Sequence, residues 1–583
     1  MAESNKARAG DTTDCDVVVI GSGAGGMAAA LTARLKGLEV IVVEKAPVLG
    51  GTLALSGGGL WIPSSPMAQA AGIQDSREAA LTYFKSCAGE YFDAARANAY
   101  LDNAPRMVKF FEENTLIRFW VDMTSPDHHP ECPGAINGGR TIFGTPVNGR
   151  ILGGEIKKLR PPKSEMTFMG IMIKPGAELM HFLNVFRSVE STKVVAKRLL
   201  QHLRDMLLYG RSMHLANGNA LAARALKSAI DLKIPMHSST TAVRLLQSNG
   251  GVSGVECSTP AGVRRFIARR GVVLATGGIA HDAARKAQLY KHVMRGGPHY
   301  SPVLDTNTGD GIRMAEQINA KFSSALSNPA GWVPMSIIPS RNPTPRTFSH
   351  VIDRPKPGFI AVTRHGVRFA NEANSYHTFG KEMIKACSNE VETSCYLVAD
   401  HDTIRRYGMG SVIRSPVPLG SKVRSGYLLR GKTLEELARK AGIDVAAFVD
   451  TVAEYNRHAV NGKDPQFGRG ESFYNRALGD PNHQPNPCVA PILRAPFYAM
   501  KLYVGDSGTF AGLATDERAR VLDTQGQVIP RLYAAGNDMC SVFGGDYLGG
   551  GSTLGPAFTF GYIAGCQLAE ETCIREKLTA GAA

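Results

Sequence analysis

The sequence lacks two features that would place it in a membrane or outside the cell. It has no run of about 18 uninterrupted apolar residues, which a membrane-spanning helix requires, and its ten cysteines form no CxxC pair. Free thiols are typical of a reducing compartment. The first sixteen residues are polar and lack the apolar segment of a secretory signal. We therefore expect a cytoplasmic protein.

Acidic residues are scarce relative to basic ones. The chain carries 51 Asp and Glu against 66 Lys and Arg, a formal net charge of +15. The basic residues are spread along the chain without a nucleic-acid-binding motif, so a nucleic-acid partner is not expected. A basic surface could instead attract anionic membranes. His128 and His129 have no third ligand spaced nearby, so no metal site is predicted.

Glycine, by contrast, is abundant and clustered. The chain has 63 glycines among 583 residues, concentrated at 21–26, 50–59, 277–278 and 544–555. Clustered glycine indicates backbone that turns sharply or lies close to another group. A chain of this length exceeds the size of one hydrophobic core, so two or more domains are expected.

The first glycine cluster lies between a predicted buried strand, residues 16–20, and a predicted helix, residues 27–36. In such a unit Gly21 allows the tight turn, Gly23 lets the backbone approach a pyrophosphate, and Gly26 lets the helix pack on the strand. The helix N-terminus offers N–H groups to the phosphates. Glu44 follows about twenty residues on, where a carboxylate accepts hydrogen bonds from ribose hydroxyls. An acidic residue here argues against a 2′-phosphate.

Further glycine turns favour FAD over NAD. A second glycine stretch follows Glu44, and two later strands run into glycine turns at 277–278 and 536. Several separated glycine segments suit an extended two-ring cofactor. The predicted cofactor-binding residues are Gly21, Gly23, Ala24, Gly25, Gly26, Glu44, Lys45, Gly51, Thr52, Ser56, Gly57, Gly58, Ala275, Thr276, Gly277, Asp310, Gly536, Asn537, Ser552 and Leu554.

The set GSGAGG, GGT…SGGGLW, VVLATGG and LYAAGN resembles the fumarate reductase/succinate dehydrogenase flavoprotein superfamily. The resemblance implies an α/β fold in which a discontinuous Rossmann-type FAD domain carries an inserted, smaller α+β cap domain. We assign 1–330 and 499–583 to the FAD domain and 331–498 to the cap. Covalent members attach flavin through a histidine beside the glycine loop. Here Leu53 follows Thr52 without a nearby histidine, so we predict non-covalent FAD.

The segment 544–562 is a glycine loop leading into a predicted helix, with Tyr547 at the apex of the loop. The Tyr547 hydroxyl and the Gly551 N–H could converge on one ketone oxygen as an oxyanion hole. This segment resembles the active-site loop of 3-ketosteroid Δ1-dehydrogenases, as do residues 371–380 and 496–509. The resemblance implies that Tyr547 and Gly551 polarise the C3 carbonyl of a 3-oxosteroid. It also implies that Tyr376 removes the C2 proton while the C1 hydride passes to flavin N5.

A tyrosine with an ordinary pKa near 10 needs help to act as a base near neutrality. In the resembled family a further tyrosine gives that help, in an Asp-Tyr-His-Pro-Glu context. Here residues 127–131 read Asp-His-His-Pro-Glu, with His128 in the place of that tyrosine. His128 could relay the proton or assist Tyr376 electrostatically. The departure leaves open a Δ4-(5α)-dehydrogenase or another desaturase of hydrophobic cyclic ketones.

Two other functions remain as alternatives. A fumarate-type reductase needs arginines to clamp two carboxylates, and the predicted cap holds Arg364, Arg368, Arg405, Arg406 and Arg414, although the Tyr547 loop has none. A non-enzymatic FAD-binding scaffold would not need a glycine-rich helix end at the reactive ring. No second nucleotide motif is present, so we expect an external electron acceptor such as a quinone.

Residues 166–212 are interpreted as an insertion. In its predicted helix, Val195, Leu199, Leu203 and Met206 fall on one face, opposite Lys193, Lys197, Arg204 and Arg211. The first interpretation is an ordinary amphipathic helix docked on the domain. The second is a basic amphipathic helix on a membrane surface, where apolar substrates partition.

Overall fold

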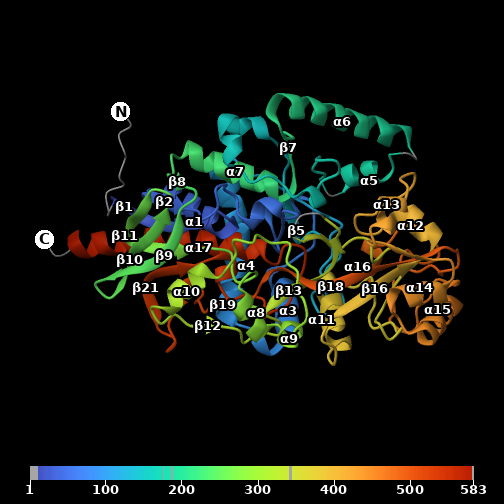
Figure 1. Ribbon diagram of the computed structural model, residues 1–583. Helices are drawn as coiled ribbons and strands as arrows, with labels where there is room; N and C mark the ends of the chain where they lie inside the picture. Colours follow the sequence, from blue (N-terminus) through green and yellow to red (C-terminus); the bar gives the residue numbers. More distant parts are fainter. Residues whose placement is uncertain (1–10, 175, 186–187, 341–344, 581–583) are drawn as a thin grey trace, which may run out of the picture.

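The computed structural model describes residues 11–174, 176–185, 188–340 and 345–580. Two large sheets organise this part of the chain. One lies at the left of Figure 1 with β1, β2 and β11, and the other lies towards the right with β16 and β18. The fold is therefore of mixed α/β type.

The first sheet has eight strands in the described part of the chain, and its centre is parallel. Strand β1 pairs in parallel with β2 and β11, and β11 with β21, so their carboxyl ends meet at one edge of the sheet. Val17, Val18 and Val19 are fully buried, as expected for a parallel strand covered on both faces. The strands are β1 Asp11–Ile20, β2 Val40–Val43, β8 Met236–His237, β9 Thr241–Ser248, β10 Gly251–Thr259, β11 Gly262–Leu274, β20 Arg520–Leu522 and β21 Val528–Ala534.

Two helices from opposite ends of the chain pack against each other beside this sheet. They are α1 (Ala24–Leu35) and α17 (Leu554–Ala580). Glycine permits the close approach: a Cβ on Gly561 would lie 2.4 Å from the Gly25 carbonyl oxygen, and one on Gly565 would lie 2.6 Å from Thr32 Cβ. Because both helices begin at the carboxyl edge of the sheet, their N-termini face the same region.

The remaining elements around the first sheet include three short sheets and several helices. The short strands are β3 Gly59–Trp61, β4 Phe119–Val121, β5 Thr141–Gly144, β6 Val147–Asn148, β7 His214–Leu215, β12 Phe322–Ser323 and β19 Gly512–Leu513. The helices are α2 Pro66–Ala70, α3 Arg77–Ala88, α4 Ala94–Asn114, α7 Asn217–Asp231, α8 Ala283–Leu289, α9 Lys291–Met294 and α10 Asp310–Glu316.

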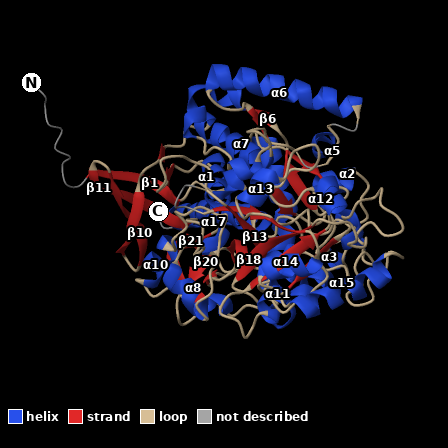
Figure 2. Cartoon of the chain, turned by 45° about the vertical axis from the view of Figure 1, so that its right-hand side comes forward, coloured by secondary structure: helices blue, strands red, loops and turns tan. Residues whose placement is uncertain are grey.

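The second sheet is antiparallel, and both of its faces are covered. Alternate residues of β15 enter different cores: Phe359 and Ala361 join one, and Ile360 and Val362 the other. Figure 2 shows helices on both sides of its strands. Its strands are β13 Ala330–Ile338, β14 Arg346–Ser349, β15 Phe359–Val362, β16 Ser394–Ala399, β17 Leu429–Gly431 and β18 Phe497–Thr509. Its helices are α11 Tyr376–Ala386, α12 His401–Tyr407, α13 Gly420–Arg424, α14 Leu434–Ala441, α15 Val445–Ala459 and α16 Phe473–Leu478.

Strand β18 begins before the expected domain boundary at 498/499 and ends after it, within the second sheet. The proposed division into an FAD domain and a cap stays a prediction, and β18 is the strand that would connect the two.

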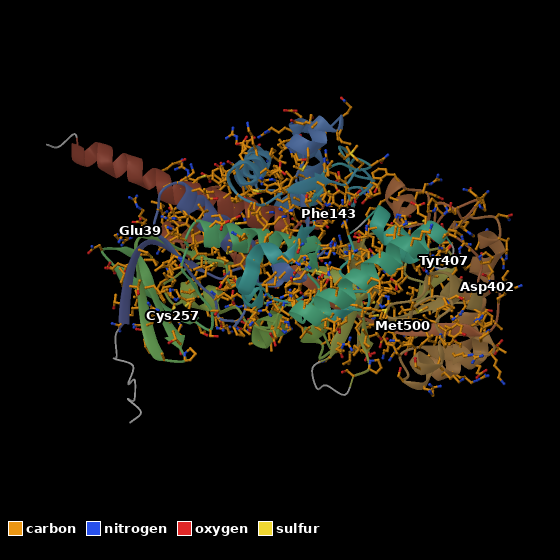
Figure 3. The ribbon with its side chains drawn as sticks, turned by 90° about the horizontal axis from the view of Figure 1, so that it is seen from above. Glu39, Phe143, Cys257, Asp402, Tyr407 and Met500 are labelled. Atoms are coloured by element: carbon orange, nitrogen blue, oxygen red, sulfur yellow. The ribbon has the colours of Figure 1, made fainter. Side chains whose placement is uncertain are left out.

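The region 166–212 folds into α5 (Ala177–Leu183) and α6 (Val189–Tyr209). Helix α6 lies along the outer edge of the molecule in Figures 1 and 2 and crosses it when seen from above in Figure 3. The predicted docking face is only partly buried. Val195 is 2% exposed, but Leu203 is 57% exposed and Met206 43%. The inward face packs Val195 and Leu199 on Ile171 and Phe182, and it also includes buried Asp205.

Candidate active site

A cavity opens at the carboxyl edge of the parallel sheet. Predicted cofactor residues that line it are Gly21, Gly23, Ala24, Gly25, Glu44, Lys45, Gly51, Thr52, Ser56, Ala275, Thr276, Gly277, Asp310, Gly536, Asn537 and Leu554. The lining does not include Gly26, Gly57, Gly58 or Ser552. Gly26 packs on the turn instead, and the Ser552 hydroxyl donates to the Gly549 carbonyl at 2.9 Å.

The glycine turn has the shape that a dinucleotide needs. Gly21 has a φ of +109°, and a Cβ there would lie 2.2 Å from the Ala275 carbonyl oxygen. Gly23 caps α1 without a side-chain hydrogen bond, and a Cβ there would meet nothing within 4 Å. The first N–H groups of α1 therefore face open space, where they can bind a pyrophosphate. These residues fit FAD.

Glu44 and Lys45 are fixed at the rim of the cavity. The Glu44 carboxylate accepts hydrogen bonds from the Ser22 N–H at 3.0 Å, the Ser22 hydroxyl at 2.7 Å and the Ala46 N–H at 2.9 Å. A carboxylate has about four acceptor positions, so capacity remains for a ribose hydroxyl. Lys45 Nζ lies 2.8 Å from Asp310 Oδ2.

Sequence reasoning missed several lining residues. Asn307 lines the cavity and donates from Nδ2 to the Thr52 hydroxyl at 3.2 Å, while Ser507 and Thr553 line the same cavity. These three residues lie in loops or strand ends without a diagnostic spacing, so no sequence signal was available for them. The described lining residues include no histidine, which is the residue that attaches flavin covalently in other members of the superfamily.

Four rings gather at one place near this cavity. The ring centroids of His128 lie 5.4 Å from Tyr376, 5.4 Å from Tyr547 and 5.2 Å from Tyr474, and Tyr376 lies 5.1 Å from Tyr547. The structure thus brings together the three predicted catalytic side chains and adds Tyr474, which no motif indicated. The Tyr376–Tyr547 contact is worth about 0.5–1.5 kcal/mol beyond its buried area.

Backbone geometry determines where each ring lies. Tyr376 is the first residue of α11, directly after the N-cap Ser375, whose side chain accepts a hydrogen bond from the Thr378 N–H. Gly551 has a φ of +96°, and a Cβ there would lie 2.3 Å from the Gly59 carbonyl oxygen. Only glycine fits both constraints, and they seat the Tyr547 loop against β3.

The Tyr547 hydroxyl connects the ring cluster with the cofactor cavity. Tyr376, Thr553, Ser507 and the backbone of Gly551 all act on its pKa, and Ser507 and Thr553 line the cavity. Burial raises the pKa of Tyr547, although these neighbouring groups act in the opposite direction. The Tyr547 side chain and the Gly551 backbone belong to one loop and interact electrostatically, and an oxyanion hole would need both to face one substrate oxygen.

Tyr376 is protonated in the substrate-free protein. Burial raises its pKa well above the ordinary value, and the neighbouring Tyr547 raises it further. The N-terminus of α11 acts in the other direction, because its positive dipole end favours a phenolate at the first helical residue.

His128 is neutral at physiological pH. Burial lowers the pKa of His128 to about 3, with further contributions from His129 and His377. A charge on this ring therefore cannot assist Tyr376. Its Nδ1 is buried without a hydrogen-bond partner among the described residues, which leaves hydrogen bonding to a substrate or a water as the way in which it could act.

A buried ion pair fixes the segment that carries His128. The Asp127 carboxylate accepts hydrogen bonds from Trp61 Nε1 at 2.8 Å and Arg140 Nη1 at 2.6 Å, and Arg140 also pairs with Asp75. Burial raises the pKa of Asp127 to about 6, against the opposing effect of Arg140.

The arginines that could serve a dicarboxylate reductase have other partners. Arg368 pairs with Glu372 and Asp464, Arg364 with Glu390, and Arg406 with Asp480. Arg405 donates to the Val417 carbonyl oxygen. Among the described residues there is also no group of three or more ligands arranged for a metal ion.

Comparisons with known proteins show the family to which the chain belongs. Residues 16–554 match the FAD binding domain family. The chain is 40% identical over 565 residues to 4-oxocyclohex-2-ene-1-carboxylate 5-dehydrogenase of Sinomonas cyclohexanicum, covering 97% of this chain and 95% of that protein. It is 35% identical over 575 residues to 3-oxosteroid 1-dehydrogenase of Mycobacterium tuberculosis, covering 95% and 98%.

A solved structure extends the likeness to three dimensions. The 3-ketosteroid delta1-dehydrogenase of Sterolibacterium denitrificans, in complex with 1,4-androstadiene-3,17-dione, matches with a TM-score of 0.87 at 34% identity. The match covers 96% of this chain and 100% of that one.

The fold and the cavity define a flavoprotein oxidoreductase. The chain belongs to the FAD binding domain family, as an FAD-dependent dehydrogenase similar to the 3-ketosteroid Δ1-dehydrogenases.

Two alanine variants separate the roles of the glycines. A Cβ at Gly26 would lie 1.9 Å from the Gly21 carbonyl oxygen, so Gly26→Ala is expected to destabilise the fold by about 1–3 kcal/mol. Gly23→Ala should leave the stability of the FAD-free protein unchanged and weaken FAD binding about tenfold, ~1.4 kcal/mol. Thermal unfolding of the apoprotein and FAD titration measure the two effects. Equal apoprotein stability of Gly26→Ala and wild type would contradict the proposed packing.

Proposed function

We propose that the protein introduces a carbon–carbon double bond α,β to the ketone of a 3-oxosteroid, at the Δ1 position. The observation that carries the proposal is the contact between the Tyr376 and Tyr547 rings, whose centroids lie 5.1 Å apart, beside the cofactor cavity. Relatives that match almost the whole chain are named as dehydrogenases of cyclic ketones.

In the proposed reaction the Tyr547 hydroxyl and the Gly551 N–H hold the ketone oxygen and stabilise the charge that develops on it. Tyr376 first gives up its own proton to solvent, and the resulting phenolate takes the proton from the carbon next to the ketone. Bound FAD supplies the two-electron acceptor for the hydride that leaves the adjacent carbon. The two C–H bonds that break leave the electron pair of the new double bond. His128 lies against both tyrosines and replaces the supporting tyrosine of the resembled family.

An uncharged substrate suits the surroundings of the rings. Arg354, which interacts electrostatically with Tyr474, donates its hydrogen bonds to the backbone carbonyls of His350 and Glu372. Lys381 lies 3.6 Å from the Asp546 carboxylate. Neither cation is free to bind a substrate carboxylate, so we favour an apolar polycyclic ketone. The 40% identity to the Sinomonas enzyme makes 4-oxocyclohex-2-ene-1-carboxylate the second candidate.

We also propose that α6 touches an anionic membrane surface, where apolar ketones and a quinone acceptor are available. Leu200, Leu203 and Leu207 are 68%, 57% and 88% exposed. Exposed Lys193, Lys197 and Arg204 lie among them on the outward face, a pattern typical of interfacial helices. No helix among the described residues has the length and apolarity needed to cross a bilayer.

Removal of either active hydroxyl tests the mechanism. Tyr547→Phe is expected to lower kcat about 10²–10³-fold, because it removes an oxyanion donor, and Tyr376→Phe about 10²–10⁴-fold, because it removes the base. Tyr290→Phe is the matched control, since the buried Tyr290 hydroxyl has no hydrogen-bond partner in the described structure. The rate of flavin bleaching under anaerobic conditions gives the result. Full activity of Tyr547→Phe would overturn the proposed role of that hydroxyl.

A substrate panel tests specificity and bond position. Androst-4-ene-3,17-dione should bleach the flavin of the wild-type protein and yield a Δ1 product, identified by mass and NMR. A 5α-saturated 3-oxosteroid distinguishes Δ1 from Δ4 desaturation. Bleaching by 4-oxocyclohex-2-ene-1-carboxylate alone would select the second candidate. Reoxidation of the reduced flavin by fumarate would favour a reductase instead.

Vesicle sedimentation tests the membrane contact. The wild-type protein should sediment with anionic vesicles and less with neutral ones, and added salt should weaken the binding. The double variant Leu203→Ser, Leu207→Ser should lose it. Val391→Ser, Val460→Ser removes exposed apolar residues elsewhere and should bind like wild type. Equal binding of all three proteins would rule out α6 as the contact.

A further inference from the structure

The three chain segments that carry the catalytic rings also meet at one carboxylate. Asp546 directly precedes Tyr547, and its Oδ1 accepts a hydrogen bond from the Tyr547 N–H at 2.7 Å. His129, which follows His128, has its Nε2 3.1 Å from the same oxygen. His377, which follows Tyr376, has its Nε2 3.4 Å away, outside hydrogen-bond geometry. Each of the three catalytic rings, His128, Tyr376 and Tyr547, is therefore adjacent in sequence to a member of this group.

The contact joins parts of the fold that no hairpin or helix connects. His377 and Lys381 lie on α11, beside the antiparallel sheet, and Lys381 Nζ is 3.6 Å from Asp546 Oδ2. His129 and Asp546 lie in loops that are also linked through Tyr83. The Tyr83 hydroxyl donates to the Leu548 carbonyl at 2.6 Å and accepts from the His129 N–H at 3.2 Å.

The group is buried and its charges are balanced. Asp546 is 7% exposed and His129 6%. Burial would lower the pKa of His129, but its hydrogen bonds to Asp546 and Glu131 outweigh burial and raise this pKa to about 10. Burial would raise the pKa of Asp546, but His129, His377 and Lys381 outweigh it and hold the pKa far below its ordinary value. Asp546 is therefore an anion and His129 a cation at neutral pH.

His377 is held as a neutral donor towards this carboxylate. Its Nδ1 accepts a hydrogen bond from the Trp332 N–H at 3.0 Å, which leaves the proton on Nε2. Burial lowers the pKa of His377 to about 3. The Trp332 backbone thereby fixes the orientation of the ring beside Tyr376.

We propose that Asp546, together with His129, is a positioning residue that sets the separation of the Tyr376 and Tyr547 hydroxyls. The proposal rests on the function proposed above for these two tyrosines. Asp546 touches no substrate in this role. It acts by fixing the Tyr547 backbone relative to the start of α11, and a misplacement of about 1 Å at an active site can cost ~10²-fold in rate.

The test compares Asp546→Asn with wild type. Asparagine keeps the size of the side chain and its acceptor for the Tyr547 N–H but removes the charge that holds His129 and Lys381. We expect kcat to fall about tenfold to a hundredfold, with KM and FAD affinity nearly unchanged. Asp353→Asn is the matched control, because Asp353 is also a buried partner of a histidine, His350, at 2.7 Å. It should lose stability without the loss in kcat.

His129→Gln provides a second route if Asp546→Asn fails to fold. Glutamine retains an N–H donor at a similar reach but carries no charge. The double variant should be no slower than the slower single variant, since both substitutions break the same contact. A wild-type kcat in both single variants, or an equal loss in Asp353→Asn, would overturn the proposal.

The pH dependence of unfolding gives a readout that does not involve catalysis. Because the pKa of His129 is raised to about 10, its stabilisation is complete below about pH 6.5, its ordinary pKa, and is lost as pH rises towards 10. The Asp546 contribution is lost only in acid, since its pKa is lowered. The advantage of wild type over Asp546→Asn should therefore shrink between pH 6.5 and 10. Other titratable or charged groups facing the pair are His128, His377, Lys381, Glu131, Tyr83 and Cys87.

A crystal structure of Asp546→Asn separates this proposal from the function itself. An increased separation of the two hydroxyls supports positioning. An unchanged separation would refute positioning, whatever the substrate is. Absence of flavin bleaching by every ketone in the wild-type protein would refute the function while leaving the geometric result intact.

Discussion

Backbone-to-backbone contact between the two ends of the chain is the constraint on which the rest of the structure depends. Gly25 lies against Ala535, Gly561 against the Gly25 carbonyl, and Gly551 against Gly59, and at each point a Cβ would come within about 3 Å of backbone atoms. Side chains larger than hydrogen would hold the segments apart. The contacts place the start of α17 and the Tyr547 loop beside the nucleotide turn, so that one cavity is built from both ends of the chain.

The antiparallel sheet supplies the other half of the site. Helix α11 approaches β13 closely, because a Cβ on Gly380 would lie 2.5 Å from Trp332 Cβ. This packing brings Tyr376, at the start of the helix, to Tyr547. Two buried carboxylates nearby, Asp127 and Asp546, connect different parts of the site. Asp127 orders the His128 segment through Arg140 and Trp61, whereas Asp546 connects three segments.

The ring cluster itself carries no net charge. Buried phenols and a neutral imidazole provide hydrogen-bond donors and acceptors but no net charge, which suits the binding of a neutral ketone. In the proposed reaction, donors at Tyr547 and Gly551 would stabilise the developing charge with little reorganisation. Histidine in place of a third tyrosine keeps an aromatic wall while changing which atom can donate a hydrogen bond.

The sequence by itself determined the cofactor and the chemistry. Strand, glycine turn and acidic residue are local in sequence, so residues 16–44 specify a nucleotide site without tertiary information, and most predicted lining residues face the cavity. The resemblance of the 544–562 and 371–380 segments indicated Tyr547, Gly551 and Tyr376. Tertiary structure alone decided that Tyr474 completes the ring cluster and that Asn307, Ser507 and Thr553 line the cavity. It also revealed that His128 is uncharged and that Asp546 meets His129 and His377. These facts depend on burial and on contacts between distant segments, and neither leaves a periodic signal in the chain.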